Sequence, residues 1–306
     1  MPLACSVILS TYNAPSLLGR SLAAFAAQDT KDFEIVIADD GSRHDTKDVI
    51  DRARRDWSLP IIHSWHEDHG FRKCRALNLA ILAATTDYLI FSDGDCLPRR
   101  DFVRTHLALA TKDRFLSGGY LKLSDKVSER LTIDDALQGR ATSYAHLRSL
   151  GLPRSLRYAK RLSTSTIFAT LSDRLTTTAP TWNGHNASCW KSDALKVNGF
   201  DERMEWGGED REFGMRLTNA GIKGLQVRFR TPCVHLDHAR GYVNDHAQRV
   251  NAQIREETMK TKSTRTAHGI AEIDRENAAI HQADSPRPNL ASKPFAQAGI
   301  QQTTTR

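Results

Sequence analysis

Residues 6–42 read SVILSTYNAPSLLGRSLAAFAAQDTKDFEIVIADDGS, and this stretch decides the fold. Two short apolar runs rich in β-branched residues, SVILS at 6–10 and FEIVIAD at 33–39, are typical of buried strands. Between them, SLLGRSLAAFAAQ at 16–28 repeats its apolar residues at helical spacing. The order strand, helix, strand predicts a βαβ unit.

The same alternation continues to residue 95. A third apolar run, PIIHSW at 60–65, precedes a helical stretch from Ala76 to Ala84, and a fourth, DYLIFSDGD at 87–95, ends in carboxylates. Strands that alternate with helices form a mostly parallel sheet, and ligands of such sheets gather at the carboxyl ends of the strands. The polar residues at the four predicted strand ends are Thr11, Asp40, His66 and Asp93. We therefore expect an α/β fold with one crevice that collects these side chains.

The composition is that of an ordinary soluble protein, with 306 residues of which 40% are apolar and 26% charged. No run of about 18 uncharged apolar residues occurs, so neither a spanning helix nor a signal peptide is predicted, and a cytoplasmic location is expected. Five scattered cysteines without a CxxC pair predict reduced, mostly buried thiols. The net charge of +7 favours anionic partners, which could be nucleotide phosphates, lipid headgroups or nucleic acid.

A short acidic motif, Asp93-Gly94-Asp95, follows the fourth predicted strand. Two carboxylates separated by one small residue can present oxygen ligands to a hard cation, and glycine lets the backbone approach a nucleotide closely. Asp and Gly are also common turn residues for purely conformational reasons. The motif alone therefore leaves both interpretations open.

A denser group of motifs lies in WNGHNASCWKSDALKVNGFDERMEWGGEDREFGMRL, residues 182–217. Trp206, Gly207 and Gly208 could form a plain loop before a helix with an acidic first turn, because carboxylates favour helix N-termini. That interpretation does not explain two glycines beside an aromatic ring and directly before two carboxylates. Trp206 offers a flat apolar face to a pyranose ring, and Asp210 offers a carboxylate that can accept a proton from a hydroxyl. The loop is therefore a candidate sugar-binding and catalytic segment.

Two histidines three residues apart, His235 and His238, lie in the segment TPCVHLDHAR at 231–240. Each one singly could be structural. A mixed carboxylate and imidazole shell around a phosphate-bound cation is the functional alternative, and it suits manganese or magnesium better than zinc.

These motifs resemble a known family. STYN at 10–13, ADDGS at 38–42, HGFRKCRALNLAI at 69–81 and DGD at 93–95 are similar, in order, to the nucleotide-binding half of family 2 glycosyltransferases with the GT-A fold. The block 183–217 resembles a galactosyltransferase-type carboxyl half with its VNGFDE and WGGED motifs. The resemblance covers roughly residues 5–240 and implies a GT-A, Rossmann-like α/β fold with helices on both faces of the sheet.

The resemblance also implies a division of the chain. Residues 1–120 would bind the nucleotide sugar, and residues 121–244 would form the acceptor-binding and catalytic half. Residues 245–306 would be a helical extension with a tail that, over 283–306, is too polar to pack and is expected to be disordered.

A donor site follows from the same resemblance. It implies these donor-binding residues: Thr11, Tyr12, Asp40, Arg72, Asn78, Asp93 and Gly94. Thr11 and Tyr12 would line the uracil pocket, and Asp40 would accept a hydrogen bond from the base. Arg72 would lie against the diphosphate, Asp93 would face the ribose and donor sugar, and Asn78 would support the pocket.

The metal and the catalytic groups are implied in the same way. Asp95 would bind Mn²⁺ or Mg²⁺ together with His238, and His235 remains an alternative ligand. Asp210 would be the catalytic base of an inverting transfer, with Glu209 holding sugar hydroxyls. Trp206, Gly207 and Gly208 would contact the acceptor. The implied reaction moves a hexose or N-acetylhexosamine from a UDP-sugar to a glycan hydroxyl in bacterial surface polysaccharide synthesis.

Two alternatives stay open. The same fold could use another nucleotide sugar, or the chain could be a sugar-nucleotide or glycan-binding protein without catalysis, although both acidic motifs are intact. Nucleic-acid binding is not expected, because no RNP-like, zinc-finger or helix-turn-helix signature accompanies the sequence pI of 9.2.

A basic stretch, HLRSLGLPRSLRYAKRL at 146–162, interleaves leucines with Arg148, Arg154, Arg157 and Arg161. It could be a solvated helix pair with an ordinary buried seam. Alternatively, its leucines could enter the surface of an anionic membrane, where a lipid-linked glycan acceptor would be located. The second interpretation predicts a peripheral position on the inner face of the cytoplasmic membrane.

Overall fold

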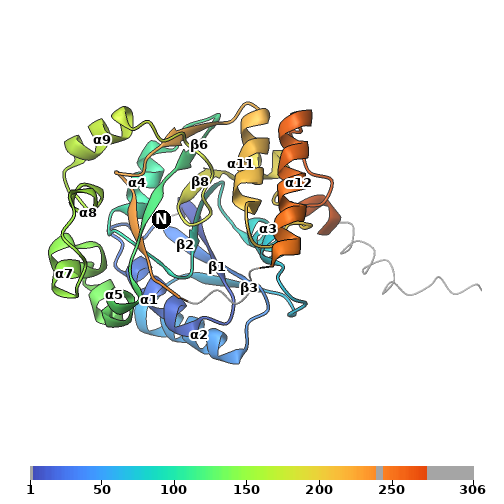
Figure 1. The fold of residues 1–306 in the computed structure, drawn as a ribbon. Coiled ribbons are helices and arrows are strands. Elements are labelled where there is room, and N and C mark those ends of the chain that lie inside the picture. Colours follow the sequence, from blue (N-terminus) through green and yellow to red (C-terminus); the bar gives the residue numbers. More distant parts are fainter. Residues whose placement is uncertain (1–2, 239–243, 274–306) are drawn as a thin grey trace, which may run out of the picture.

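The computed structural model describes residues 3–238 and 244–273. At its centre, a seven-stranded sheet has the order β3, β2, β1, β4, β8, β6, β9 (Figure 1). Its strands are β1 (Cys5–Thr11), β2 (Phe33–Asp39), β3 (Ile61–Trp65), β4 (Tyr88–Asp93), β6 (Arg114–Ser117), β8 (Ala187–Trp190) and β9 (Lys223–Gln226). β3, β2, β1 and β4 are parallel, β8 is antiparallel to β4 and β6, and β9 is parallel to β6. The predicted α/β fold with a mostly parallel sheet is confirmed.

Helices cover both faces of this sheet, as expected. One face packs against α1 (Pro15–Ala26), α2 (His44–Trp57) and α4 (Phe102–Leu109). The other packs against α3 (Lys73–Ala83), α10 (Lys191–Lys196), α11 (Glu209–Asn219) and α12 (Asp245–Thr261). Because side chains alternate along a strand, Val7 and Leu9 of β1 enter the first core, whereas Ile8 between them enters the second.

A second, three-stranded sheet has the order β5 (Cys96–Pro98), β10 (Pro232–His235), β7 (Gly119–Lys122). β10 is antiparallel to β5, so His235 lies opposite Cys96 and the two histidines reach the Asp93-Gly94-Asp95 motif. Short helices follow β7: α5 (Asp125–Arg130), α6 (Ile133–Leu137), a 3₁₀ helix (Arg140–Thr142), α7 (Tyr144–Ser149), α8 (Leu156–Arg161) and α9 (Thr166–Leu175).

The burial of the leucines in the basic stretch 146–162 disagrees with the interpretation that these leucines enter a membrane. Leu147, Leu152 and Leu162 are at most 4% exposed and belong to the core beneath α5 to α8, and of the stretch's leucines Leu156 alone is prominently exposed, at 80%. The expectation that these leucines enter a membrane is therefore wrong for the three buried ones. Their burial follows from tertiary packing, which the alternation of Leu and Arg along the chain does not reveal.

All five cysteines are free and buried, as predicted. α12 is helical where a helical extension was expected. The tail predicted to be disordered, residues 283–306, lies outside the described residues. No helix in the described part of the chain is long and apolar enough to cross a membrane.

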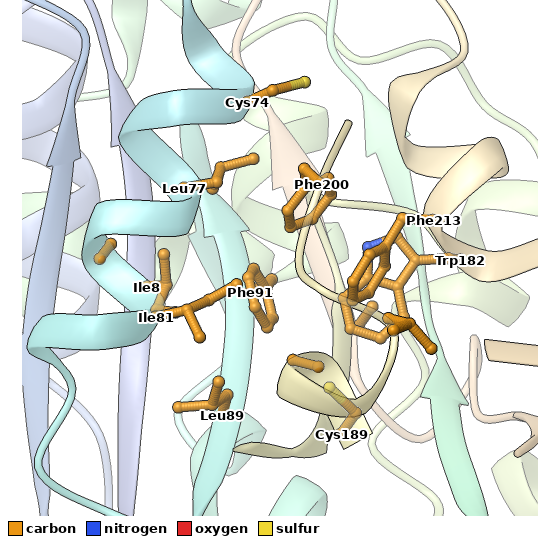
Figure 2. Close-up of a cluster of buried hydrophobic side chains, with 14 of the residues drawn as sticks. Ile8, Cys74, Leu77, Ile81, Leu89, Phe91, Trp182, Cys189, Phe200 and Phe213 are labelled. Carbon is orange, nitrogen blue, oxygen red and sulfur yellow. The ribbon is translucent and has the colours of Figure 1, made fainter. Parts of the chain in front are cut away.

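An aromatic cluster forms part of the core that α3 and α11 cover (Figure 2). Trp182 packs edge-on against Phe91 and Phe213, with ring centroids 5.1 and 4.8 Å apart, and Phe200 stacks on Phe213 at 4.3 Å. A Cβ on Gly214 would lie 2.5 Å from that of Trp182, so glycine is needed for α11 to approach this closely. Each ring is close in sequence to a segment of the candidate site, so one cluster fixes those segments relative to one another.

Candidate active site

The ends of the first four strands meet along one edge of the sheet, as expected. Asp40 donates its backbone N–H to the carbonyl of Thr11, and its carboxylate lies 3.1 Å from His66 Nε2. The other carboxylate oxygen accepts a hydrogen bond from the backbone N–H of Arg72 at 2.9 Å. The hydrogen bond to Asp40 raises the pKa of His66, against the effect of burial. Asp40 therefore links three loops at this edge.

The candidate uracil pocket has one buried and one exposed side. Thr11 is 8% exposed, and its hydroxyl is buried without a hydrogen-bond partner. Tyr12 is 47% exposed and donates its hydroxyl to Asp68 at 2.9 Å. A buried free hydroxyl beside an exposed ring can hold a planar base.

Asp93 lies in a strongly polar environment at the end of β4. Its Oδ1 accepts from Ser10 Oγ at 2.6 Å and from Lys73 Nζ at 3.1 Å. Burial opposes ionisation of Asp93, but the charges of Lys73 and His185 and these hydrogen bonds lower its pKa below the usual range. Burial also opposes the charge of Lys73, yet the carboxylates around it raise its pKa. Asp93 and Lys73 thus form a partly buried ion pair in which both members stay charged.

Two predicted donor-site residues, Gly94 and Asn78, make contacts that stabilise the fold. A Cβ on Gly94 would lie 2.9 Å from the carbonyl oxygen of Ser10, so strand packing is what excludes a side chain there. Asn78 is completely buried, and its amide bonds the backbone N–H and carbonyl of Phe200 and the carboxylate of Glu202. Asn78 has no surface that a donor could touch. It positions the VNGFDE loop against α3, and its supporting role in the donor pocket stays a prediction.

Asp95, His235 and His238 come together although Asp95 precedes His235 by 140 residues in the sequence. Their ligand atoms lie within 4.8 Å of one another. His238 Nε2 lies 2.9 Å from Asp95 Oδ2, and His235 Nε2 lies 3.4 Å from the same oxygen. Among the described residues, Asp95 Oδ1 and His235 Nδ1 are buried without hydrogen-bond partners. One carboxylate and two imidazoles with unused acceptor atoms suit a cation of the manganese type.

The glycines before α11 have a conformational role. Gly207 and Gly208 have φ angles of +113° and +99°, which other residues rarely adopt. Asn251 of α12 donates to the carbonyls of Glu205 and Gly207 and so holds the loop from outside. Trp206 is half-buried within this loop. The backbone requirement accounts for both glycines, and acceptor contact by this loop stays a prediction.

Glu209 and Asp210 open α11. Glu209 is 6% exposed and accepts from the backbone N–H of Gly207 at 2.9 Å. Asp210 Oδ2 accepts from the backbone N–H of Gly184 at 3.0 Å, whereas its Oδ1 is buried with no partner. Burial, followed by the charge of Glu209, raises the pKa of Asp210 to about 7, and Lys73 limits the rise. Asp210 can therefore exchange a proton near neutral pH.

This arrangement corresponds to what known sequences indicate. The sequence profile described as glycosyl transferase family 2 matches residues 6–165, more than half of the chain. The chain belongs to glycosyl transferase family 2. A second profile, described as the N-terminal domain of galactosyltransferase, matches residues 170–240 of this family 2 member. This range includes Asp210 and both candidate metal-site histidines.

Relatives of this family 2 enzyme are themselves glycosyltransferases. Validoxylamine A glucosyltransferase of Streptomyces hygroscopicus subsp. jinggangensis is 31% identical over 235 residues, covering 71% of this chain and 52% of the relative. Chondroitin synthase of Escherichia coli is 25% identical over 227 residues, covering 71% of this chain and 32% of the relative. The chain thus spans about half or less of the length of these relatives.

Solved structures with the same fold belong to the GT-A class. S. aureus TarS 1–349 in complex with UDP-GlcNAc has a TM-score of 0.58 at 17% identity, covering 94% of this chain and 74% of that one. Mannosyltransferase PcManGT from Pyrobaculum calidifontis, in complex with GDP-Man and Mn²⁺, has a TM-score of 0.55 at 18% identity, covering 85% and 65%. At these identities the similarity establishes the fold alone, and the expected GT-A fold is confirmed.

Sequence reasoning missed two residues of this family 2 site, Lys73 and His185. Burial lowers the pKa of His185 to about 4, although the charge of Asp93 opposes the change. Its ring lies 4.4 Å from that of Tyr120, which is in turn 5.3 Å from His235. Both missed residues lie within the quoted motifs HGFRKCRALNLAI and WNGHNASCW, where a lysine and a histidine beside the other polar motif residues were usable signals.

Proposed function

We propose that this chain is an inverting glycosyltransferase that moves a hexose or N-acetylhexosamine from a UDP-sugar to a glycan hydroxyl. The observation that carries the proposal is Asp210, whose unpartnered oxygen and pKa of about 7 suit a general base. An inverting transfer needs a proton acceptor beside the acceptor hydroxyl, and the sequence predicts Asp210 for this role. Glu209, held toward Gly207, is left to bind sugar hydroxyls.

Donor binding is assigned to the edge that collects the strand ends. Thr11 and Tyr12 would hold the uracil, with Asp40 as acceptor for the base. Asp93, kept ionised by Lys73, would bind ribose and sugar hydroxyls. Arg72, at the start of α3, would face the diphosphate. The half formed by residues 1–120 would then supply the donor site, and residues 121–244 the base and the acceptor side.

A divalent cation, Mn²⁺ or Mg²⁺, fits the Asp95, His235 and His238 cluster. It would supply charge neutralisation for the departing diphosphate. Both histidines present Nε2 to the same Asp95 oxygen, so the structure supports His235 as a ligand beside His238.

A nucleotide-release assay with Mn²⁺ tests the proposal. UDP-glucose, UDP-galactose, their N-acetylamino counterparts and GDP-mannose are offered separately, and Asp210→Asn serves as the catalytic control. UDP release from one UDP-sugar, reduced in the control, is expected. Turnover of GDP-mannose alone would assign a different donor. Tight UDP binding without turnover of any donor would indicate a binding protein.

We also propose a peripheral position on an anionic membrane, the inner face of the cytoplasmic membrane in a bacterium, where a lipid-linked glycan acceptor would be reached. α8 and α9 lie at one side of the molecule (Figure 1). Along α9, Ile167, Leu171 and Leu175 recur every fourth residue and are 76%, 50% and 79% exposed. Residues 141–190 contain six Lys and Arg but one acidic residue, Asp173, which is paired with Arg230. Exposed apolar side chains within a basic surface suit an anionic interface.

Vesicle sedimentation tests this location. Binding to anionic vesicles and weak binding to neutral ones is expected, and Ile167→Ser with Leu175→Ser should weaken it at unchanged net charge. Arg154→Gln with Lys160→Gln should remove about 2 kcal/mol of binding, since each basic residue near the surface adds about 1 kcal/mol. Equal sedimentation with both vesicle types would contradict the proposal.

A further inference from the structure

A cavity of about 390 Å³ lies beside the catalytic carboxylate. Asn183 and His185 form part of its wall, and Gly184 between them donates its backbone N–H to Asp210 at 3.0 Å. Tyr120, also in the wall, contacts the rings of His185 and His235. The cavity therefore adjoins both the candidate base and the candidate metal cluster. The predicted donor residues are not among its lining residues.

Three arginines line this cavity, and we call them the arginine cluster: Arg157 and Arg161 from α8, and Arg228 from the segment after β9. In residues 3–238 and 244–273, none of the three forms an ion pair with a carboxylate. The nearby Asp173 accepts instead from Arg230 and from the backbone N–H of Phe229. The cluster thus carries three positive charges that no carboxylate of the described residues pairs with directly.

Arg161 is the most deeply placed member of the cluster. It is 8% exposed, lies over the ring of Phe229 at 5.4 Å, and makes one long hydrogen bond of 3.5 Å, to the carbonyl of Tyr120. A guanidinium has five N–H donors, so most of its capacity is unused. Arg228 bonds the hydroxyl of Thr178, but its Nε is buried without an acceptor.

The arrangement is unfavourable without an anion. Burial, followed by the charges of Arg228 and Arg157, lowers the pKa of Arg161 to about 10. Burial and Arg157 also lower the pKa of Arg228. Lys122 also lines the cavity, but its charge is paired with that of Asp237 at 2.9 Å. It therefore adds less positive potential to the cavity than the three arginines do. A bound anion would relieve the repulsion and satisfy the free donors together.

We propose that the arginine cluster binds an anionic group, a carboxylate or a phosphate, of the acceptor, so that the enzyme glycosylates an acidic glycan. The inference rests on the proposed function, which places the acceptor beside Asp210. A planar guanidinium matches either group with two parallel hydrogen bonds, and three of them select for charge as well as position. A cavity of this volume is within the range of small-ligand sites and can take one acidic sugar residue or a sugar phosphate.

Calorimetry with the full chain, UDP and Mn²⁺ tests the pocket without requiring turnover. The probes are methyl β-D-glucuronide for a carboxylate, inorganic phosphate for a phosphate, and methyl β-D-glucoside as the neutral counterpart. At least one anion should bind at least about 10-fold more tightly than the glucoside, since hydrogen bonds to charged groups contribute that much. The anion that binds distinguishes the two sources.

Arg157→Gln and Arg228→Gln should each weaken the preferred anion by about 10-fold or more and leave the glucoside unchanged. Arg157 is exposed, so its replacement should not disturb folding, and a melting curve checks this. Arg174→Gln is the matched control, because it removes an exposed charge on α9 outside the cavity lining. An equal loss of anion affinity in Arg174→Gln would show that net charge alone causes the effect, and this would overturn the proposal. Equal affinity of the wild type for all three probes would overturn it as well.

A donor arm separates this pocket from the donor site. If Arg157→Gln weakens UDP-glucuronate relative to UDP-glucose and leaves the free anions unaffected, the anionic group belongs to the donor and the proposal is wrong. Failure of every nucleotide sugar in the turnover screen, with anion binding and its loss in Arg228→Gln intact, would reject the proposed reaction and retain the anion site.

Discussion

Replacing Asp210 with asparagine removes the candidate base at nearly constant shape. Asp210 Oδ2 accepts a hydrogen bond from Gly184 at 3.0 Å, and the side-chain oxygen of asparagine can accept the same bond. What is lost is the proton-accepting Oδ1, which has no other partner. We expect kcat to fall by about 10²- to 10⁴-fold, the range for loss of a general base, while UDP affinity stays close to wild type.

The pH dependence sharpens this expectation. Because burial and Glu209 raise the pKa of Asp210 to about 7, the carboxyl is protonated, and inactive as a base, below that pH. About one tenth of it is ionised at pH 6 and about nine tenths at pH 8, so kcat/KM should rise roughly 10-fold between them. Asp210→Asn should remove this limb. Glu209→Gln removes a neighbouring charge and should shift the limb to lower pH.

The assay is UDP release at saturating Mn²⁺ and constant ionic strength from pH 5.5 to 8.5, with calorimetry for UDP. An Asp210→Asn enzyme that keeps both its turnover and the limb near pH 7 would refute the assignment. A variant that loses UDP affinity but retains turnover would instead place Asp210 in the donor site.

Three further outcomes follow from the geometry. Asp95→Ala and His238→Ala should each weaken Mn²⁺-dependent UDP binding by at least about 10-fold in calorimetry, and excess chelator should reproduce the loss in wild type. Gly184→Ala would place a Cβ 2.5 Å from the Asp210 carboxylate, so kcat should fall by about 10²-fold with an unchanged melting temperature. Glu212→Ala leaves the 1%-exposed Arg216 without its ion pair and should cost about 3–5 kcal/mol in urea denaturation. Normal UDP binding in Asp95→Ala and His238→Ala would contradict the first prediction, and normal turnover in Gly184→Ala the second. A loss of less than about 1 kcal/mol in the free energy of unfolding of Glu212→Ala would contradict the third.

The nucleotide-binding part of the fold was predictable because its signals are local. Each of the first four strands is a short apolar run ended by polar residues, and the observed β1 to β4 differ from the predicted bounds by at most two residues. Parallel strands place their carboxyl ends at one edge, which is why Asp40, His66 and Asp93 could be grouped before any coordinates. The metal cluster needed the family resemblance, because nothing local connects Asp95 with histidines 140 residues away.

The burial of charged and polar side chains could not be predicted from the sequence. Arg161 looked like one more solvated charge in a basic stretch, yet it is buried over Phe229, which lies far along the chain. Asn78 was expected to support the donor pocket, but the sequence did not reveal that Phe200 and Glu202 are its partners. In each case the partner is distant in sequence, and short-range patterns carry no information about it.

Lys73 shows how one charge can give two carboxylates different protonation behaviour. Both Asp93 and Asp210 are subject to burial and to the field of Lys73. Asp93 also accepts hydrogen bonds from Ser10 and from Lys73 itself, so it stays ionised and suits the proposed role of accepting hydrogen bonds from sugar hydroxyls. Asp210 has a backbone hydrogen bond and the repulsion of Glu209, so its pKa stays near 7. Environments that separate the pKa values of neighbouring carboxyls assign one to binding and the other to proton transfer. The same lysine thereby connects Asp93 on β4, the candidate donor ligand, to Asp210 on α11, the candidate base. A charge count along the sequence would treat these two acidic motifs as unrelated.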